Sequence, residues 1–214
     1  ESTYYSPLDD GYTDVVGSFL AFAALREDGS IRTWGGGYPG FWADYSIPLN
    51  TPTDDGYVHI VASGARRSSF AAVKADGSVT SWGDVNHSPP GNGYTQVIAG
   101  ENSFTAIRAD GTVYSWDDGG SLSNTPSEAG FTHVVANANA FAAIRADGSV
   151  ITWGVATSGG DSSSVAGDLQ NVVKIVPAGL AFAALRADGT VISWGNSTQG
   201  GDSSAIAGDL IGVS

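Results

Sequence analysis

The sequence predicts an all-β protein, a β-propeller with five blades that each hold three to four antiparallel strands. Three observations predict this fold. One thirteen-residue pattern occurs five times, each copy has the form of a β-hairpin, and a further short strand precedes each hairpin. The copies recur about every 40 residues, which is the period of a propeller blade. The chain of 214 residues is therefore expected to form a single domain, residues 1–214.

The repeated pattern has a fixed internal spacing. Phe stands six residues before Asp, and Asp stands six residues before Trp, with no gap in any copy. The predicted hairpin cores are residues 22–34, 70–82, 104–116, 141–153 and 182–194. The tryptophans that end these cores, from Trp34 to Trp194, are expected to pack between blades because each large ring can cover the adjacent sheet.

An Asp-Gly pair lies near the centre of every core, as at Asp147-Gly148. Asp-Gly is the preferred pair for a two-residue type I′ turn, in which both residues have positive φ. The sequence therefore predicts type I′ hairpins. A basic residue stands two positions before each Asp, as Arg145 does in this copy. It is expected either to pair with nearby acids or carbonyl groups, or to contribute to a ring that binds an anion.

A third strand is predicted before each hairpin, at residues 13–16, 58–61, 95–98, 132–135 and 173–176. An aromatic residue opens four of these strands, as Tyr12 does in the first copy. Residues 208–213 repeat the register of residues 167–172, so the terminal segments are expected to meet in one blade of a closed ring. The alternative is a slice of a larger ring or an open array.

The composition excludes several classes of partner. The net charge is −13, from 22 Asp and Glu against 9 Lys and Arg, so binding to nucleic acid or to an anionic membrane is not expected. No apolar run is long enough for insertion into a membrane. The absence of Cys excludes disulfides and thiolate metal sites. Such an acidic surface suits a secreted protein, and an extracellular location is predicted.

The longest connector between repeats carries the first candidate binding residues. Tyr38, Phe41, Trp42 and Tyr45 lie there among glycines. Their rings are suited to stack on a sugar or to anchor a protein partner. The alternative is that they plug the end of the propeller.

Arg66 and Arg67, in an insertion of the second repeat, are the only adjacent pair of cations in the sequence. Their fork-shaped guanidinium groups would suit a carboxylate or sulfate of the ligand. The alternative is a solvated loop tip.

His59 and His133 occupy the same position in two repeats, where the other copies have Asp14, Gln96 and Lys174. One variable polar residue per blade could tune a binding face, and an unconstrained exposed position would vary in the same way. No metal site is predicted, because the histidines lack a metal-binding spacing. Asp161 and Asp202, in two Gly-Gly-Asp-Ser-Ser segments, are expected to bend the chain rather than to bind calcium.

No catalytic residues and no cofactor are predicted. The sequence has no Gly-x-Ser-x-Gly elbow, no phosphate loop and no His-Glu-x-x-His motif. A pair of carboxylates for glycoside cleavage stays open, because spacing in sequence says little about approach in a propeller. The protein is therefore predicted not to be an enzyme.

The segment Ile144–Gly154, IRADGSVITWG, resembles the repeat of the regulator of chromosome condensation family. Segments 159–163 and 200–204 stand where that repeat has its Gly-Gln-Leu-Gly motif. The resemblance extends over nearly the whole chain and implies a β-propeller, as a divergent member of bacterial, secreted type. The family usually has seven blades, whereas this chain supplies five. Secreted propellers with similar repeats act by presenting loops to another protein.

The predicted function is that of a non-catalytic binding module, which presents inter-blade loops to a protein partner, extracellularly or within a larger adhesive protein. The alternative is a carbohydrate-binding, lectin-type propeller. A lectin with one site per blade should repeat its binding residues, but the aromatic connector occurs only once. The chain is expected to be a monomer or a ring completed by self-association.

Overall fold

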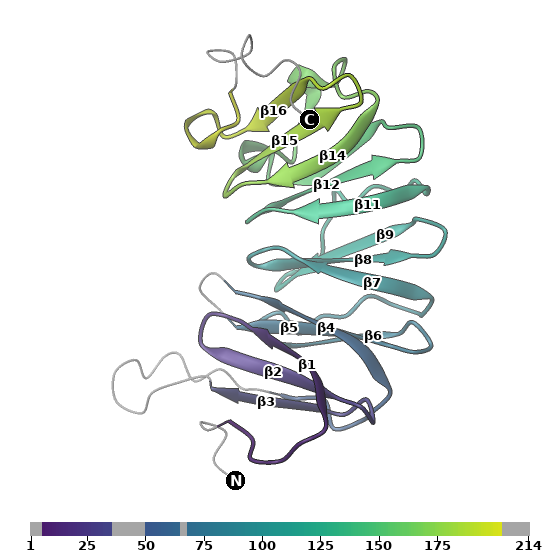
Figure 1. Ribbon diagram of the computed structural model, residues 1–214, viewed down its shortest axis with the longest axis vertical. Helices are drawn as coiled ribbons and strands as arrows, with labels where there is room; N and C mark the ends of the chain where they lie inside the picture. Colours follow the sequence, from purple (N-terminus) through teal and green to yellow (C-terminus); the bar gives the residue numbers. More distant parts are fainter. Residues whose placement is uncertain (1–5, 36–49, 65–67, 203–214) are drawn as a thin grey trace. The chain divides into compact units, whose positions relative to one another are not determined.

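The computed structural model describes residues 6–35, 50–64 and 68–202, which contain strands and three single-turn 3₁₀ helices. The strands form five antiparallel sheets, called blades 1 to 5 in chain order (Figure 1). Four of these sheets have three strands and blade 3 has four, and each strand pairs with the next one in sequence. The prediction of an all-β chain with blades of three to four antiparallel strands is confirmed. The predicted ring closure through residues 208–213 lies outside the described residues.

The strands agree with the predicted hairpins and first strands, with ends that differ by one or two residues. Their bounds are β1 (Tyr12–Gly17), β2 (Ala21–Arg26) and β3 (Ile31–Gly35) in blade 1; β4 (Tyr57–Ser63), β5 (Ser69–Lys74) and β6 (Val79–Gly83) in blade 2; β7 (Tyr94–Ala99), β8 (Ser103–Arg108), β9 (Val113–Asp117) and β10 (Gly120–Ser121) in blade 3; β11 (Phe131–Ala136), β12 (Ala140–Arg145) and β13 (Val150–Gly154) in blade 4; and β14 (Val172–Pro177), β15 (Ala181–Arg186) and β16 (Val191–Gly195) in blade 5. The 3₁₀ helices are η1 (Ala156–Ser158), η2 (Ser163–Val165) and η3 (Ser197–Gln199).

The chain divides into two compact units. The first comprises Glu1–Ala109 and Tyr114–Leu122, and holds blades 1 and 2 and most of blade 3. The second comprises Asp110–Val113 and Ser123–Ser214, and holds blades 4 and 5 with the turn of blade 3. That the whole chain forms a single domain stays a prediction.

Each blade has two different faces because side chains alternate along its strands. The aromatic face carries the Phe and Trp of the repeat, which stack on each other; in blade 2 the ring centroids of Phe70 and Trp82 are 5.4 Å apart. The alanine face carries the alanines beside that Phe and the aliphatic residues near the turn, such as Ala23, Leu25 and Ile31 in blade 1.

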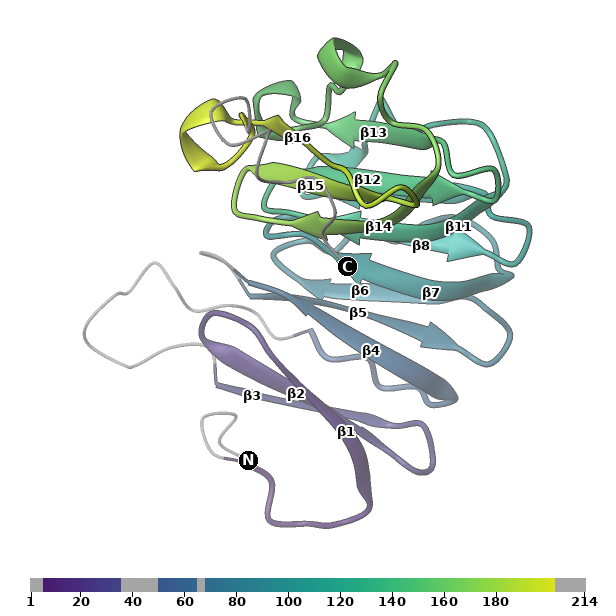
Figure 2. The same ribbon diagram turned by 45° about the horizontal axis from the view of Figure 1, so that its top comes forward.

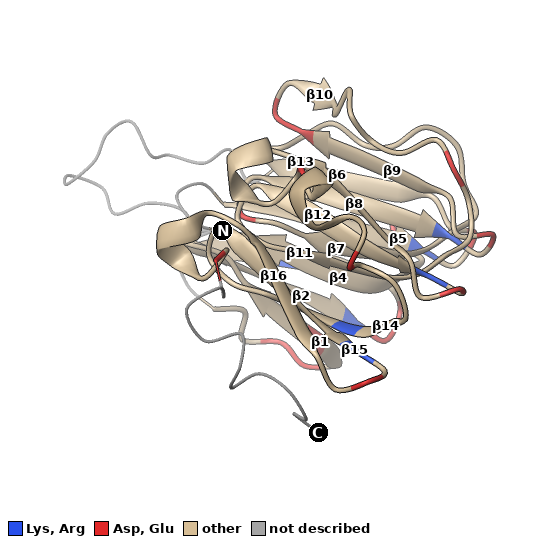
Figure 3. Cartoon of the chain, turned by 90° about the horizontal axis from the view of Figure 1, so that it is seen from above, with Lys and Arg blue, Asp and Glu red and all other residues tan. Residues whose placement is uncertain are grey.

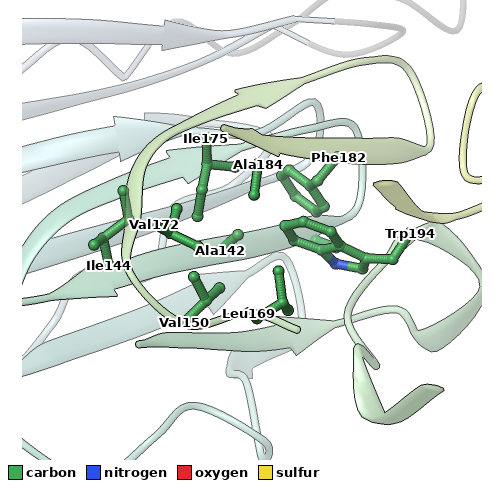
Figure 4. Packing of buried hydrophobic residues seen from close by; sticks show 10 residues of the cluster. Ala142, Ile144, Val150, Leu169, Val172, Ile175, Phe182, Ala184 and Trp194 are labelled. Carbon is green, nitrogen blue, oxygen red and sulfur yellow. The ribbon is translucent and has the colours of Figure 1, made fainter. Parts of the chain in front are cut away.

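The core lies between blades, where the alanine face of one blade packs against the aromatic face of the next. This packing occurs between blades 1 and 2 and between blades 2 and 3 in the first unit, and between blades 4 and 5 in the second. Figure 2 shows the strands of these neighbouring blades as successive layers within each unit. Figure 4 shows Phe182 and Trp194 of blade 5 together with Ala142, Ile144 and Val150 of blade 4. Burial of such aliphatic and aromatic surface is the main favourable contribution to folding.

Trp82, Trp116 and Trp194 pack between blades as predicted. Trp82, Trp116, Trp153 and Trp194 are at most 2% exposed, whereas Trp34 is only partly buried. The burial of an indole requires a partner for its N–H group.

Two of these indoles find that partner on the alanine face of the preceding blade. Trp82 Nε1 donates to Thr33 Oγ1 (3.3 Å), and Trp116 Nε1 donates to Ser81 Oγ (3.1 Å). Trp194 Nε1 instead donates to the Gly159 carbonyl oxygen (3.0 Å).

The hairpin turns are not the type I′ turns that the Asp-Gly pairs predict. The glycines have positive φ, as in Gly29 at +79°, but the Asp residues do not. The Gly29 N–H donates to the Arg26 carbonyl oxygen (2.9 Å), and the Arg26 N–H donates to the Ser30 carbonyl oxygen (3.0 Å). This is a three-residue loop, a type I turn followed by a left-handed glycine.

The Asp carboxylate stabilises this loop. Asp28 Oδ1 accepts hydrogen bonds from both the N–H (2.9 Å) and the hydroxyl (2.7 Å) of Ser30, two residues further on. Bonds of this local kind favour turns over continued strand. The same pair of bonds occurs at Asp76, Asp110, Asp147 and Asp188.

The turn of one blade contacts the start of the next blade. The Tyr94 N–H donates to the Gly77 carbonyl oxygen (3.0 Å), and the Gly93 N–H donates to the Asp76 carbonyl oxygen (3.3 Å). A Cβ atom on Gly77 would lie 2.5 Å from the backbone nitrogen of Gly93. Gly77 is therefore required both for its φ of +79° and for the close approach of the next blade.

We predict that Gly77→Ala lowers the free energy of unfolding by about 3 kcal/mol, from left-handed strain and the clash with Gly93 together. The matched control is Gly93→Ala, because Gly93 has a similar φ of +82° but no atom within 4 Å of the new Cβ. It should cost only the strain, about 1 kcal/mol. Urea unfolding measures both values. Equal losses would contradict the close contact between turn and blade.

Candidate binding surface

The first strand of each blade carries a β-bulge that exposes a polar residue. In β11 the pairing register shifts between Phe131 and His133, so that Phe131 pairs with Arg145 and His133 with Ile144. The extra residue, Thr132, keeps Phe131 buried while His133 is exposed. Bulges of this kind re-aim side chains and are found at functional edges of sheets.

The same bulge occurs in all five first strands, and four different residue types follow it in the five blades. These residues are Asp14, His59, Gln96, His133 and Lys174. His59 is half-buried and the other four are exposed. The same backbone conformation thus carries acidic, amide, imidazole or ammonium side chains in different blades. This arrangement can distinguish partners without any change in the scaffold.

In the second unit, two of these positions border an open groove of about 720 Å³. His133 of β11 and Lys174 of β14 lie on it, with Arg145 and Asp147 from the end of the blade 4 hairpin. Ile144 also lines it. With His133 counted as neutral, Arg145 and Lys174 against the single carboxylate of Asp147 give this groove the opposite charge balance to the acidic chain as a whole.

The groove has two basic groups free to bind. Among the residues that the structure describes, neither the His133 ring nor the Lys174 ammonium has a hydrogen bond or an ion pair. Figure 3 shows that charged residues lie mainly at turns and strand ends. A carboxylate of a partner could bind here without the loss of any existing pair.

Arg145, in contrast, is held by contacts within its blade. Its Cζ lies 5.3 Å from the centroid of the Phe131 ring, and its Nη2 lies 3.8 Å from a carboxylate oxygen of Glu128. Three other blades have a similar contact between the basic residue and the aromatic that opens the blade: Arg26 over Tyr12, Lys74 over Tyr57 and Arg108 over Tyr94.

Blade 5 has Val172 in place of this aromatic, and Arg186 donates to the Gln170 carbonyl oxygen (3.0 Å) and pairs with Asp188 (3.1 Å). These contacts favour the structural interpretation of the five basic residues over an anion-binding ring.

The carboxylates of the turns stay ionised because of their own hydrogen bonds. The Ser149 hydroxyl and N–H hold the pKa of Asp147 below its usual value, and Thr190 acts in the same way on Asp188. At Asp76 the backbone N–H of the residue two positions on has the larger effect. Asp147 is thus a fixed negative charge beside the basic groups of the groove.

The structure places only two of the predicted binding residues. Tyr38, Phe41, Trp42 and Tyr45 lie outside the described residues, and so do Arg66 and Arg67. His59 and His133 lie at equivalent bulges of blades 2 and 4, as the repeat predicts. A role for these residues in binding stays a prediction.

Sequence reasoning singled out neither Lys174 nor the groove. The sequence shows Lys174 only as the basic residue among the five at the variable position of the first strand. The groove is formed by two adjacent blades, so no single repeat predicts it.

The Gly-Gly-Asp-Ser-Ser segment of blade 4 bends the chain as expected. Asp161 Oδ1 accepts a hydrogen bond from the Ser163 N–H (2.9 Å) at the start of η2. Within residues 6–35, 50–64 and 68–202, no three His, Asp or Glu side chains are placed to share a metal ion. None of the helices in those ranges has the length and hydropathy to cross a membrane.

No family model and no curated protein matches the chain by sequence. Solved structures do match it. The CRINKLY WD40 ectodomain of the receptor kinase ACR4 from Arabidopsis thaliana is 16% identical with a TM-score of 0.56, over 86% of this chain and 65% of that one. Prp20p from Saccharomyces cerevisiae is 16% identical with a TM-score of 0.54, over 86% and 57%. A structure of yeast RCC1 (Prp20) bound to Kap60 gives 16% and 0.52, over 86% and 56%.

The chain has an RCC1-like β-propeller fold. The family resemblance of the repeat is thereby confirmed at the level of the fold, and the bacterial, secreted type stays a prediction. The chain spans 56–65% of the length of these three propellers. At 16% identity this similarity shows that the fold is shared, but it shows nothing about the binding site.

The lowered pKa values of the turn aspartates predict a loss of stability in acid. Each carboxylate contributes stability that is fully present above its unfolded pKa of 3.8, and that contribution is lost as the pH falls through the lower folded pKa. The melting temperature should therefore fall with decreasing pH below about 4. Replacing Asp76 and Asp147 by Asn should flatten this fall.

The control variant replaces Asp10 and Asp55 by Asn, since their side chains make no hydrogen bond with described residues. Thermal unfolding followed by circular dichroism between pH 2 and 7 compares the two variants. An unchanged acid slope in the Asp76/Asp147 variant would refute this role of the turn carboxylates.

Proposed function

We propose that the protein is a non-catalytic binding module that holds a protein partner on the bulged first strands and the inter-blade loops of its propeller. The groove beside β11 and β14 would receive an acidic side chain of that partner. His133 and Lys174 would donate to its carboxylate.

The single observation that carries this proposal is the presence of unpaired basic groups at a repeated, exposed position. Each blade has the same bulge, yet the side chain after it is acidic in blade 1 (Asp14) and basic in blade 5 (Lys174). His133 and Lys174 both line the groove, and neither side chain has a hydrogen bond or an ion pair with any residue that the structure describes. An exposed charge that contributes no ion pair to the fold is available for recognition.

The matched propellers support a protein as the partner. Prp20p is reported with its binding to Gsp1p and histones, and yeast RCC1 forms a complex with Kap60. The ACR4 structure is an ectodomain, which accords with the proposed extracellular location. The net charge of −13 would favour a partner with a largely basic surface, since long-range attraction steers encounter even where a local contact has the opposite sign.

The lectin alternative rests on the aromatic connector at residues 36–49, which lies outside the described residues. Self-association belongs to the proposal as well, because the faces through which neighbouring blades pack are also present in a second copy of the chain.

We predict that a random peptide library displayed on phage will yield ligands for the immobilised chain that contain Asp or Glu. Synthetic copies of these peptides should bind the Lys174→Glu variant about tenfold more weakly, because attraction becomes repulsion at an exposed pair. Calorimetric titration measures the affinities.

The matched control is Lys74→Glu, since Lys74 is the other lysine of the chain, pairs with Asp54 (2.5 Å) and does not line the groove. It should leave peptide affinity unchanged. The proposal fails if no peptide is enriched, or if Lys174→Glu binds as well as the unmodified chain. Saturable binding on a glycan array that is lost in Trp42→Ala would favour the lectin alternative instead.

A further inference from the structure

Blade 1 leaves its aromatic face uncovered within the described part of its unit. Phe22 is 48% exposed, whereas the Phe at this position in each of the other blades is at most 1% exposed. Val15 is 59% exposed, whereas its counterpart Ile60 is 1% exposed. Phe22 and Trp34 still stack with ring centroids 5.5 Å apart, as in the covered blades. The face thus has the shape of a blade interface without its partner.

Blade 5 leaves its alanine face uncovered in the same way. Ala183 and Leu185 are partly exposed, whereas their blade 4 counterparts Ala142 and Ile144 are 0% and 7% exposed. Val176, on the neighbouring strand, is 49% exposed. Apolar residues exposed side by side on a sheet face are typical of an interaction surface.

One buried polar atom of blade 5 indicates which chemical group would complete its alanine face. Ser193 Oγ is buried and has no hydrogen-bond partner. Its counterparts in blades 1 and 2, Thr33 and Ser81, accept the indole N–H of the next blade. In blade 4 the counterpart Thr152 bonds the Gly160 carbonyl oxygen (3.2 Å) instead. A buried hydroxyl without a partner is costly, and an incoming indole would satisfy it.

We propose that the aromatic face of blade 1 binds the alanine face of blade 5 in a second copy of the chain. The contact would repeat the interface between blades 1 and 2, with Trp34 Nε1 donating to Ser193 Oγ of the other copy. Because the two faces differ, the association is head-to-tail.

This inference names the surface for the self-association in the proposed function, and it does not depend on the groove at His133 and Lys174. Peptide binding by that groove and the mass of the assembly are separate measurements. Failure of one therefore leaves the other interpretable.

Two blocking variants test the head-to-tail contact. Phe22→Arg blocks the aromatic face of blade 1, and Ala183→Arg blocks the alanine face of blade 5. The unmodified chain should show masses above 21.8 kDa that rise with concentration in sedimentation velocity. Each variant alone should remain at 21.8 kDa. An equimolar mixture should form a species of twice that mass, because each variant keeps the face that the other lacks.

Leu8→Arg is the control, since Leu8 is fully exposed and belongs to neither face. It should assemble as the unmodified chain does. Far-UV circular dichroism checks that every variant is folded, and Ser193→Ala provides a mild second variant that should weaken assembly about threefold to tenfold. The proposal is overturned if the unmodified chain is monomeric at all concentrations, if blocked variants still assemble alone, or if folded blocked variants do not pair when mixed.

Discussion

The structure depends on the contact between the alanine face of one blade and the stacked Phe and Trp rings of the next. Small side chains such as Ala71 allow two sheets to approach while the indole plane covers the neighbouring strands. In two of these contacts the hydroxyl that precedes Trp in one blade accepts the indole N–H of the following blade, as Ser81 does from Trp116. Because a hairpin cannot cover its own rings, each blade must pack against a neighbour to bury them. The turns contact the first strand of that neighbour.

Much of this scaffold could be predicted from the sequence because its determinants recur at fixed spacing. The positions of Phe, Asp and Trp located every hairpin, and the short segments before the hairpins, four of which open with an aromatic residue, were recognised as the first strands. The turn type was missed because an Asp-Gly pair fits two kinds of hairpin loop. The observed loop is stabilised by bonds from the Ser or Thr two residues after Asp, such as those from Ser149 to Asp147, and the Asp-Gly pair alone does not predict them.

The candidate site was less predictable because it has no repeated signature. Lys174 and His133 lie on strands 41 residues apart in sequence, and only the packing of blade 5 on blade 4 brings both to one groove. The repeat pattern predicts where on the strand these two residues lie, but it does not predict which residues of the neighbouring blade surround them. Trp34 shows the same limit in the core, since its sequence context matches the other copies while its burial depends on whether another blade covers its face.

The hydrogen bonds between the turn of one blade and the first strand of the next have a consequence for how the chain changes over time. The Gly148 carbonyl oxygen accepts the Val172 N–H (2.9 Å), as Gly77 accepts from Tyr94. Each repeat is thus registered only by its neighbour, so stability is roughly a sum of nearest-neighbour contributions. Duplication or deletion of a whole repeat would preserve every remaining junction, which allows evolution to adjust the length of the array without a redesign of its interior.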